Sequence, residues 1–156
     1  MTVEERKEVQ PGSSLEQAIK DPALVELSSE YAELALDSVL DDGAAKDLPI
    51  VGTLVKLVSF GNSINKRIFK KKIYKFLFQL KSTSSSQRSA LIRKINDSGK
   101  FQSSVGENLF EILEKIESDG KPEIVGKVFA ALVEDKIHYM DFLKACLLYT
   151  SDAADE

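Results

Sequence analysis

The sequence predicts an all-α fold, a single irregular or orthogonal bundle of about six to seven helices. In one segment after another, apolar residues recur at the three- and four-residue spacing of an amphipathic helix. The connections between these segments are short, and the β-branched run near residue 50 has no second strand-like run with which to pair. At 156 residues the chain fits one domain that is long enough to bury a hydrophobic core.

Residues 1–20 are expected to form a disordered N-terminal segment, ahead of a helical domain over residues 21–145. Met1–Pro11 is polar and lacks the apolar stretch of a secretory signal. The stretch Pro11-Gly12-Ser13-Ser14 has the composition of a loop. Because no apolar run in the chain approaches the ~20 residues that span a bilayer, we expect a cytoplasmic protein.

Two helices are predicted in the first part of the domain. Asp21-Pro22 is a favourable start, since Asp caps a helix and Pro fits the first helical position. Apolar residues at helical spacing continue from there to Val39, with carboxylates on the opposite face. A second, almost wholly apolar helix is predicted over Leu48–Phe60.

A central helix is predicted from Asn62 to about Lys81. One broad apolar face is formed by Phe69, Ile73, Phe76, Leu77 and Leu80. Tyr74 and Phe78 lie on the other side, among lysines. Apolar residues on both sides are typical of a helix that is contacted by neighbours on both.

Four shorter helices complete the predicted bundle. The first covers Gln87–Asn96, and Ser84 with Gln87 fits a capping box at its start. Ser103 or Ser104 caps the second, whose apolar residues are Val105, Leu109, Ile112, Leu113 and Ile116. The third begins near Pro122 and the last near Tyr139.

Charge divides the chain into three blocks. Residues 1–47 carry a net charge of -8, residues 48–96 carry +11 without one Asp or Glu, and residues 97–156 carry -7. A basic block between two acidic ones indicates that the blocks neutralise one another in the folded state. An anionic partner, either membrane lipid or nucleic acid, is the alternative.

The basic and apolar segment 48–81 holds the candidate residues for an anionic partner. Bulky apolar residues flanked by lysines are typical of an element that lies on a membrane surface. The same residues suit nucleic acid, but no recognised reader motif accompanies them. The candidates are Lys56, Lys66, Arg67, Lys70, Lys71, Lys72, Lys75, Tyr74 and Phe78.

The sequence indicates no catalytic, cofactor or metal site. His138 is the single histidine and lies beside a helix start, which favours a capping or solvent-facing role. Glu107, Glu111 and Glu114 form one helix stripe, but without a histidine three residues on they are expected to form a solvated face. We therefore expect a non-enzymatic protein without a cofactor.

Three functions remain open, and we rank them from the most favoured to the least. The first is action through protein–protein contacts, with an unknown protein or by self-association. The second is peripheral binding at the inner face of a membrane through segment 48–81, as in a defence or toxin protein. The third is weak binding of nucleic acid through the same segment.

Three hydrophobic patterns carry a resemblance: Asp47–Leu57 (DLPIVGTLVKL), Tyr74–Lys81 (YKFLFQLK) and Gly126–Leu143 (GKVFAALVEDKIHYMDFL). Together they resemble small bacterial all-helical proteins. The last pattern closes like the helix-turn-helix of tellurite-resistance-type helical domains. The resemblance covers about half of the chain, and it implies a helical fold without implying an activity.

The final residues, Cys146–Glu156 (CLLYTSDAADE), carry a resemblance of another kind. Their reverse translation reproduces the mosaic end and adapter of transposase-based sequencing libraries. On this resemblance, an environmental or metagenomic gene of bacterial or phage-like type runs into adapter after Ala145. We therefore expect that residues 146–156, including the single cysteine, are not native and take no part in function.

Overall fold

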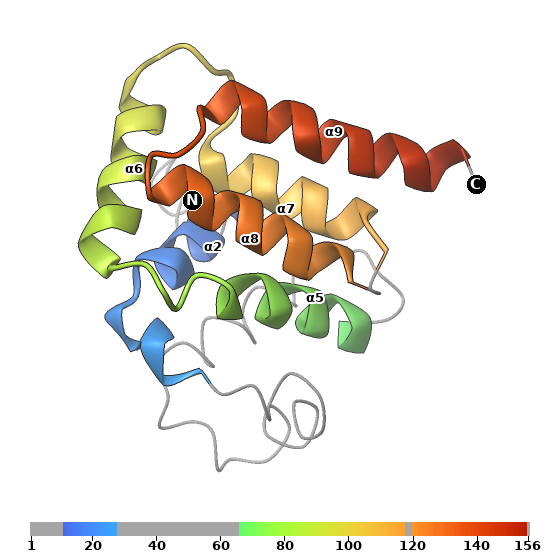
Figure 1. Ribbon diagram of the computed structural model, residues 1–156, viewed down its shortest axis with the longest axis horizontal. Coiled ribbons are helices and arrows are strands. Elements are labelled where there is room, and N and C mark those ends of the chain that lie inside the picture. Colours follow the sequence, from blue (N-terminus) through green and yellow to red (C-terminus); the bar gives the residue numbers. More distant parts are fainter. Residues whose placement is uncertain (1–10, 28–65, 118–119, 156) are drawn as a thin grey trace, which may run out of the picture.

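The computed structural model describes residues 11–27, 66–117 and 120–155, and this part of the chain is helical without any strand (Figure 1). It contains α2 (Pro11–Lys20), the 3-10 helix η1 (Pro22–Glu26), α5 (Lys66–Phe78), α6 (Ser85–Asp97), α7 (Val105–Lys115), α8 (Lys121–Val133) and α9 (Tyr139–Asp155). The axes of helices α5, α7, α8 and α9 are roughly parallel, with α5 and α8 running opposite to α7 and α9, and α6 lies across their ends (Figure 1). The predicted all-α bundle is confirmed.

The prediction of disorder is wrong for residues 11–20. They form α2, in which Leu15, Ala18 and Ile19 are fully buried, and α2 packs against α6 and α7. Pro11 takes the first helical position, where its missing N–H costs nothing, so a residue read as a loop signal starts a helix. Residues 1–10 lie outside the described part.

Two glycines allow α2 and α7 to cross closely. A Cβ added to Gly12 would lie 2.7 Å from the backbone nitrogen of Glu107. A Cβ added to Gly106 would overlap the carbonyl oxygen of Gly12. Because both backbones occupy the space of a side chain, this crossing requires glycine at both positions.

The helix start at Asp21 is confirmed, with a different helix following it. The Asp21 Oδ1 accepts a hydrogen bond from the backbone N–H of Ala23 at 2.9 Å, and Pro22 opens the helix. However, η1 is a 3-10 helix, and Leu27 after it has extended backbone. The continuation to Val39 and the predicted helix over Leu48–Phe60 lie outside the described residues.

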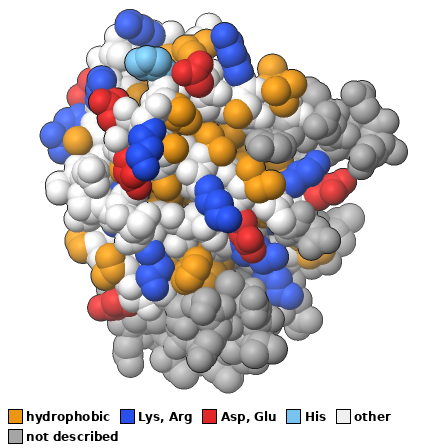
Figure 2. Space-filling model, viewed as in Figure 1, with side chains coloured by type: hydrophobic (Ala, Val, Ile, Leu, Met, Phe, Trp, Pro, Cys, Tyr) orange, Lys and Arg blue, Asp and Glu red, His pale blue; other side chains and the backbone are white. Residues whose placement is uncertain are grey.

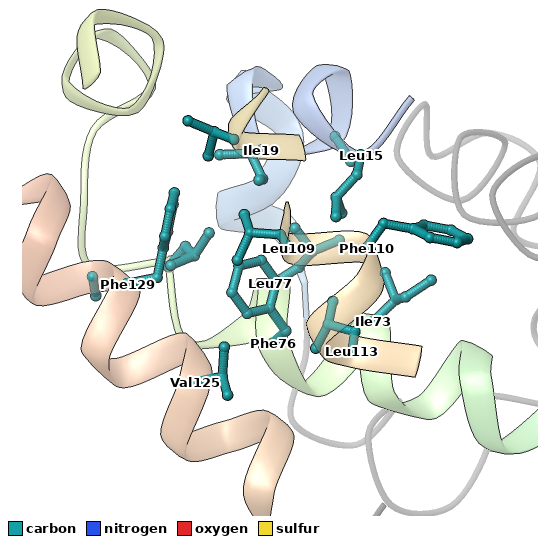
Figure 3. Packing of buried hydrophobic residues seen from close by; sticks show 14 of the residues in the cluster. Leu15, Ile19, Ile73, Phe76, Leu77, Leu109, Phe110, Leu113, Val125 and Phe129 are labelled. Atoms are coloured by element: carbon teal, nitrogen blue, oxygen red, sulfur yellow. The ribbon is translucent and has the colours of Figure 1, made fainter. Parts of the chain in front are cut away.

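Helix α5 is the predicted central helix, and its broad apolar face is in the core. The helix ends at Phe78, three residues before the predicted Lys81, and Leu80 lies in the turn that follows. All five predicted residues of that face are at most 2% exposed: Phe69, Ile73, Phe76, Leu77 and Leu80. Figure 3 shows Ile73, Phe76 and Leu77 among core side chains from α2, α7 and α8. Gly126 brings α8 close to α5, since a Cβ there would lie 2.7 Å from the carbonyl oxygen of Phe76.

The predicted caps of α6 and α7 are confirmed. The Ser84 hydroxyl accepts from the N–H of Gln87, and the Gln87 side chain accepts from the N–H of Ser84, each at 3.1 Å. The Ser104 hydroxyl accepts from the N–H of Glu107 at 3.1 Å, which settles the choice between Ser103 and Ser104. These bonds satisfy donors that the first turn of a helix leaves open.

The last helix begins at Tyr139, as predicted, and continues through the adapter-like residues to Asp155. Phe142 is fully buried and Cys146 is 1% exposed, whereas Leu147 and Leu148 are each 66% exposed. Helix formation by residues 146–155 does not bear on their origin. The adapter resemblance therefore stays a prediction.

Candidate contact surface

The structure divides the predicted basic candidates between surface and interior. Lys70, Lys71 and Lys75 are half-buried on α5. Lys72 is 9% exposed, and its Nζ donates to the carbonyl oxygen of Glu114 at 3.2 Å. Burial lowers the pKa of Lys72, and the nearby Glu114 carboxylate partly opposes that shift. Lys56 and the side chains of Lys66 and Arg67 lie outside the described part.

The aromatic candidates do not present a surface for lipid or bases. Tyr74 is 1% exposed, so its side chain lies in the interior. Phe78 is half-buried, and the Lys81 Nζ lies 5.0 Å from the centre of its ring. With the broad face of α5 also buried, this helix brings lysines to the surface while most of its bulky apolar groups face inward.

The histidine and the glutamate stripe lie where the sequence predicts. His138 is exposed at the start of α9, where its backbone N–H donates to the Asp141 carboxylate at 3.3 Å. Glu107, Glu111 and Glu114 are exposed, and Glu111 pairs with Lys115 at 2.8 Å. Among the described residues, no group of three or more His, Cys, Asp or Glu is placed to hold a metal ion.

An apolar groove between α6 and the α8–α9 connection is the feature that sequence reasoning missed. Its volume is about 290 Å³. One wall is a single stripe formed by Leu91, Lys94 and Ile95 of α6 and by Ser98, the residue that caps its C-terminus. The remaining lining residues are Lys100, Phe101, Leu132, Asp135, Ile137, His138, Tyr139 and Met140.

The shape of this groove depends on the turn between α8 and α9. Asp135 has a φ of 64°, a left-handed conformation that reverses the chain directly after α8. Tyr139 is then held by Phe101, with ring centres 4.9 Å apart, and by Asn108, whose Nδ2 donates to the Tyr139 hydroxyl at 2.9 Å. The groove is therefore lined in part by a fixed aromatic ring.

The groove is apolar inside and charged at its rim. Met140 is 50% exposed, and Leu91, Phe101 and Ile137 are half-buried. Four exposed side chains with ionisable groups line the same groove: Lys94, Lys100, Asp135 and His138. Figure 2 shows the histidine at the edge of a face on which apolar side chains lie among lysines and carboxylates.

A second hollow, of about 210 Å³, lies between α7 and α9. It is lined in part by Cys146 and Leu147, which belong to the adapter-like segment. On the prediction that this segment is adapter-derived, the hollow would be incomplete in the native chain. The groove at α6 does not use them.

Within the described ranges, no helix is long and apolar enough to cross a bilayer. Comparisons of the chain with protein-family models, with curated proteins and with solved structures give no match.

Proposed function

We propose that this chain is a non-enzymatic helical protein that acts through protein–protein contacts, and that the groove between α6 and the α8–α9 connection is a contact surface. The observation that carries the proposal is Met140, which is 50% exposed at a concave surface with half-buried Leu91, Phe101 and Ile137. Concave apolar surface of this kind is where proteins bind partners, since its burial removes apolar area from water.

The size of the groove is compatible with anchoring side chains of a protein partner. Pockets for drug-sized ligands run from about 300 to 1,000 Å³. At about 290 Å³ the groove lies at the lower end of that range, and it has room for one or two large apolar side chains. A short protein segment that inserts such anchors fits this volume.

The polar groups of the groove support binding over catalysis. Nucleophilic or acid–base catalysis needs a base that is oriented by a second group. Among the described residues, no hydrogen bond or ion pair joins the side chains of Lys94, Lys100, Asp135 and His138 to one another. Exposed and unconnected charges of this kind suit recognition at the rim of an interface.

Selection of displayed peptides on the full 156-residue chain tests the proposal. Random peptides of about 16 residues are enriched on the immobilised chain and then synthesised. We expect their affinity to fall about tenfold on Met140→Gln, because the variant removes apolar contact at the groove. Val25→Gln is the matched control, since Val25 is 56% exposed on η1 and lies outside the groove.

Two results would contradict the proposal. One is that no peptide is enriched on the chain. The other is that the enriched peptides bind the Met140→Gln and Val25→Gln variants equally well. Circular dichroism and thermal unfolding of both variants establish that each remains folded.

Peripheral membrane binding is the second candidate, favoured by the half-buried Lys70, Lys71 and Lys75 on one helix. Lysines near an anionic leaflet each contribute about 1 kcal/mol. The candidate predicts retention on phosphatidylglycerol vesicles that is lost when these three lysines become Gln. Retention should persist when Lys121, Lys127 and Lys144 become Gln, which changes the charge equally. Nucleic acid ranks third and predicts salt-dependent retention on single-stranded DNA through the same lysines.

A further inference from the structure

We propose that the groove takes an acidic amphipathic α-helix from a partner protein. This inference rests on the proposed function above and adds the class of partner. Three features of the groove support it: the length of its α6 wall, the chemistry of its interior and the sign of its charge.

The α6 wall matches a helix in length and spacing. Leu91, Lys94, Ile95 and Ser98 are separated by three, four and seven residues, so they form one continuous stripe. Seven residues of α-helix rise about 10 Å, which is about two turns. A helix that lies along this stripe presents its own anchors at the same three-, four- and seven-residue spacing.

The interior suits aliphatic anchors. Leu91, Ile137 and Met140 offer flexible or branched side chains without polar atoms other than the Met140 thioether. Methionine at a binding surface adapts its shape to different apolar partners. The partner helix would therefore insert Leu, Ile, Met or Phe.

The charge at the groove selects an acidic partner. Lys94 lies within the α6 stripe and Lys100 lies beyond its end, while Asp135 is the single carboxylate in the lining. His138 is the fourth ionisable side chain of the lining. Because all four groups are exposed, they govern the choice of partner and the rate of encounter more than the final affinity.

A sequence pattern within the peptides selected on the full chain tests this inference. We expect the enriched peptides to carry Asp or Glu beside apolar residues at helical spacing. We expect their affinity to fall about tenfold on Lys94→Glu/Lys100→Glu and to fall with added salt. Lys127→Glu/Lys144→Glu is the matched control, because both lysines are exposed outside the groove and the charge change is the same.

The outcomes separate this inference from the proposed function. Peptides that need Met140 but are basic, or that bind despite a central proline, would overturn the acidic helix and leave the contact surface intact. Peptides that are insensitive to Met140→Gln would overturn both. If anionic vesicles bind the wild-type chain but not the Lys94→Glu/Lys100→Glu variant, the groove is assigned to lipid. If the chain forms a dimer without peptide and Met140→Gln abolishes it, the groove is assigned to a second copy of this chain.

Discussion

Arg88 is fully buried and satisfies its guanidinium with backbone oxygens. Its Nε donates to the carbonyl of Ile19, its Nη1 to the carbonyl of Thr83, and its Nη2 to the carbonyl of Asp21 at 3.1 Å. Burial lowers its pKa, and the Asp21 carboxylate partly opposes the shift. One side chain thus joins the end of α2, the start of η1 and the α5–α6 connection.

Replacing Arg88 by Met should destabilise the fold strongly. The variant keeps an unbranched side chain but removes the guanidinium donor from the carbonyl groups of Ile19 and Thr83, which costs about 2–4 kcal/mol in total. Arg93→Met on the exposed face of the same helix should change the free energy of unfolding by less than about 0.5 kcal/mol. Urea denaturation of both variants measures the difference, and equal losses would contradict the assigned role.

Glu16 joins α2 to the start of α7. Its carboxylate accepts from the backbone N–H of Gly106 at 2.9 Å and from the Asn96 side chain at 3.1 Å. The Asn96 carbonyl oxygen in turn accepts from the N–H of Val105 at 3.0 Å. A carboxylate at a helix N-terminus faces unpaired donors and the positive end of the helix dipole, so this arrangement is favourable.

The crossing of α2 and α7 gives a prediction at the scale of elements. Intrinsic helix propensity alone predicts that Gly106→Ala stabilises α7 by about 0.5–1 kcal/mol. The structure predicts the opposite sign, because the new methyl group would overlap the carbonyl oxygen of Gly12. We expect a loss of about 1–3 kcal/mol from overpacking.

The sign of the change in unfolding free energy decides between these expectations. Gln17→Ala on the exposed face of α2 controls for a general effect of alanine in this helix pair. A stabilised Gly106→Ala variant would show that the two helices can separate without cost. Both free energies are obtained from the midpoint of urea denaturation, with the same dependence of the unfolding free energy on urea concentration for each variant.

Local sequence signals predict the elements whose structure depends on residues close together in the chain. The capping box at Ser84, the cap at Ser104 and the apolar face of α5 were identified because each depends on residues close together in the chain. Helix α2 was missed because its Pro11-Gly12 start is also typical of a loop. Glycine is needed at position 12 because the backbone of α7, about a hundred residues away in the sequence, occupies the space of a side chain.

The groove could not be predicted for a related reason, which belongs to the whole molecule. Leu91 and Ile95 belong to the predicted helix Gln87–Asn96, and Ile137 and Met140 flank the predicted start of the last helix near Tyr139. That these residues line one concave surface depends on how α6 crosses the ends of the other helices. The stretch Ile137–Met140 (IHYM) places bulky apolar side chains at a turn, and this is the sequence signal that could have suggested exposed apolar surface there.

The predicted neutralisation between charge blocks stays a prediction. Two ion pairs between described residues are local: Glu111 with Lys115 and Glu134 with Lys136, at 2.8 and 2.9 Å. Exposed pairs of this kind contribute at most about 1 kcal/mol each. The acidic residues between 28 and 47 that would face the basic block lie outside the described part.

The stability of the whole molecule should fall in alkaline solution. Burial raises the pKa of the Tyr139 hydroxyl above its ordinary value of 10.0 and the pKa of the Cys146 thiol to about 12. As the pH rises past the ordinary values, the unfolded chain releases these protons first, so the free energy of unfolding declines. Burial of Lys72 acts in the opposite sense, because its lowered pKa favours the neutral amine in the folded state.

Tyr139→Phe isolates the contribution of the tyrosine. At neutral pH the variant should lose about 1 kcal/mol with the hydrogen bond from Asn108. It should then lose less stability than the wild type between about pH 9 and pH 11, because it has no phenol to ionise on unfolding. The two curves of unfolding free energy against pH should therefore converge as the pH rises. Parallel curves would show that Tyr139 ionises as readily in the folded chain as in the unfolded one, which is incompatible with its place in the wall of the groove.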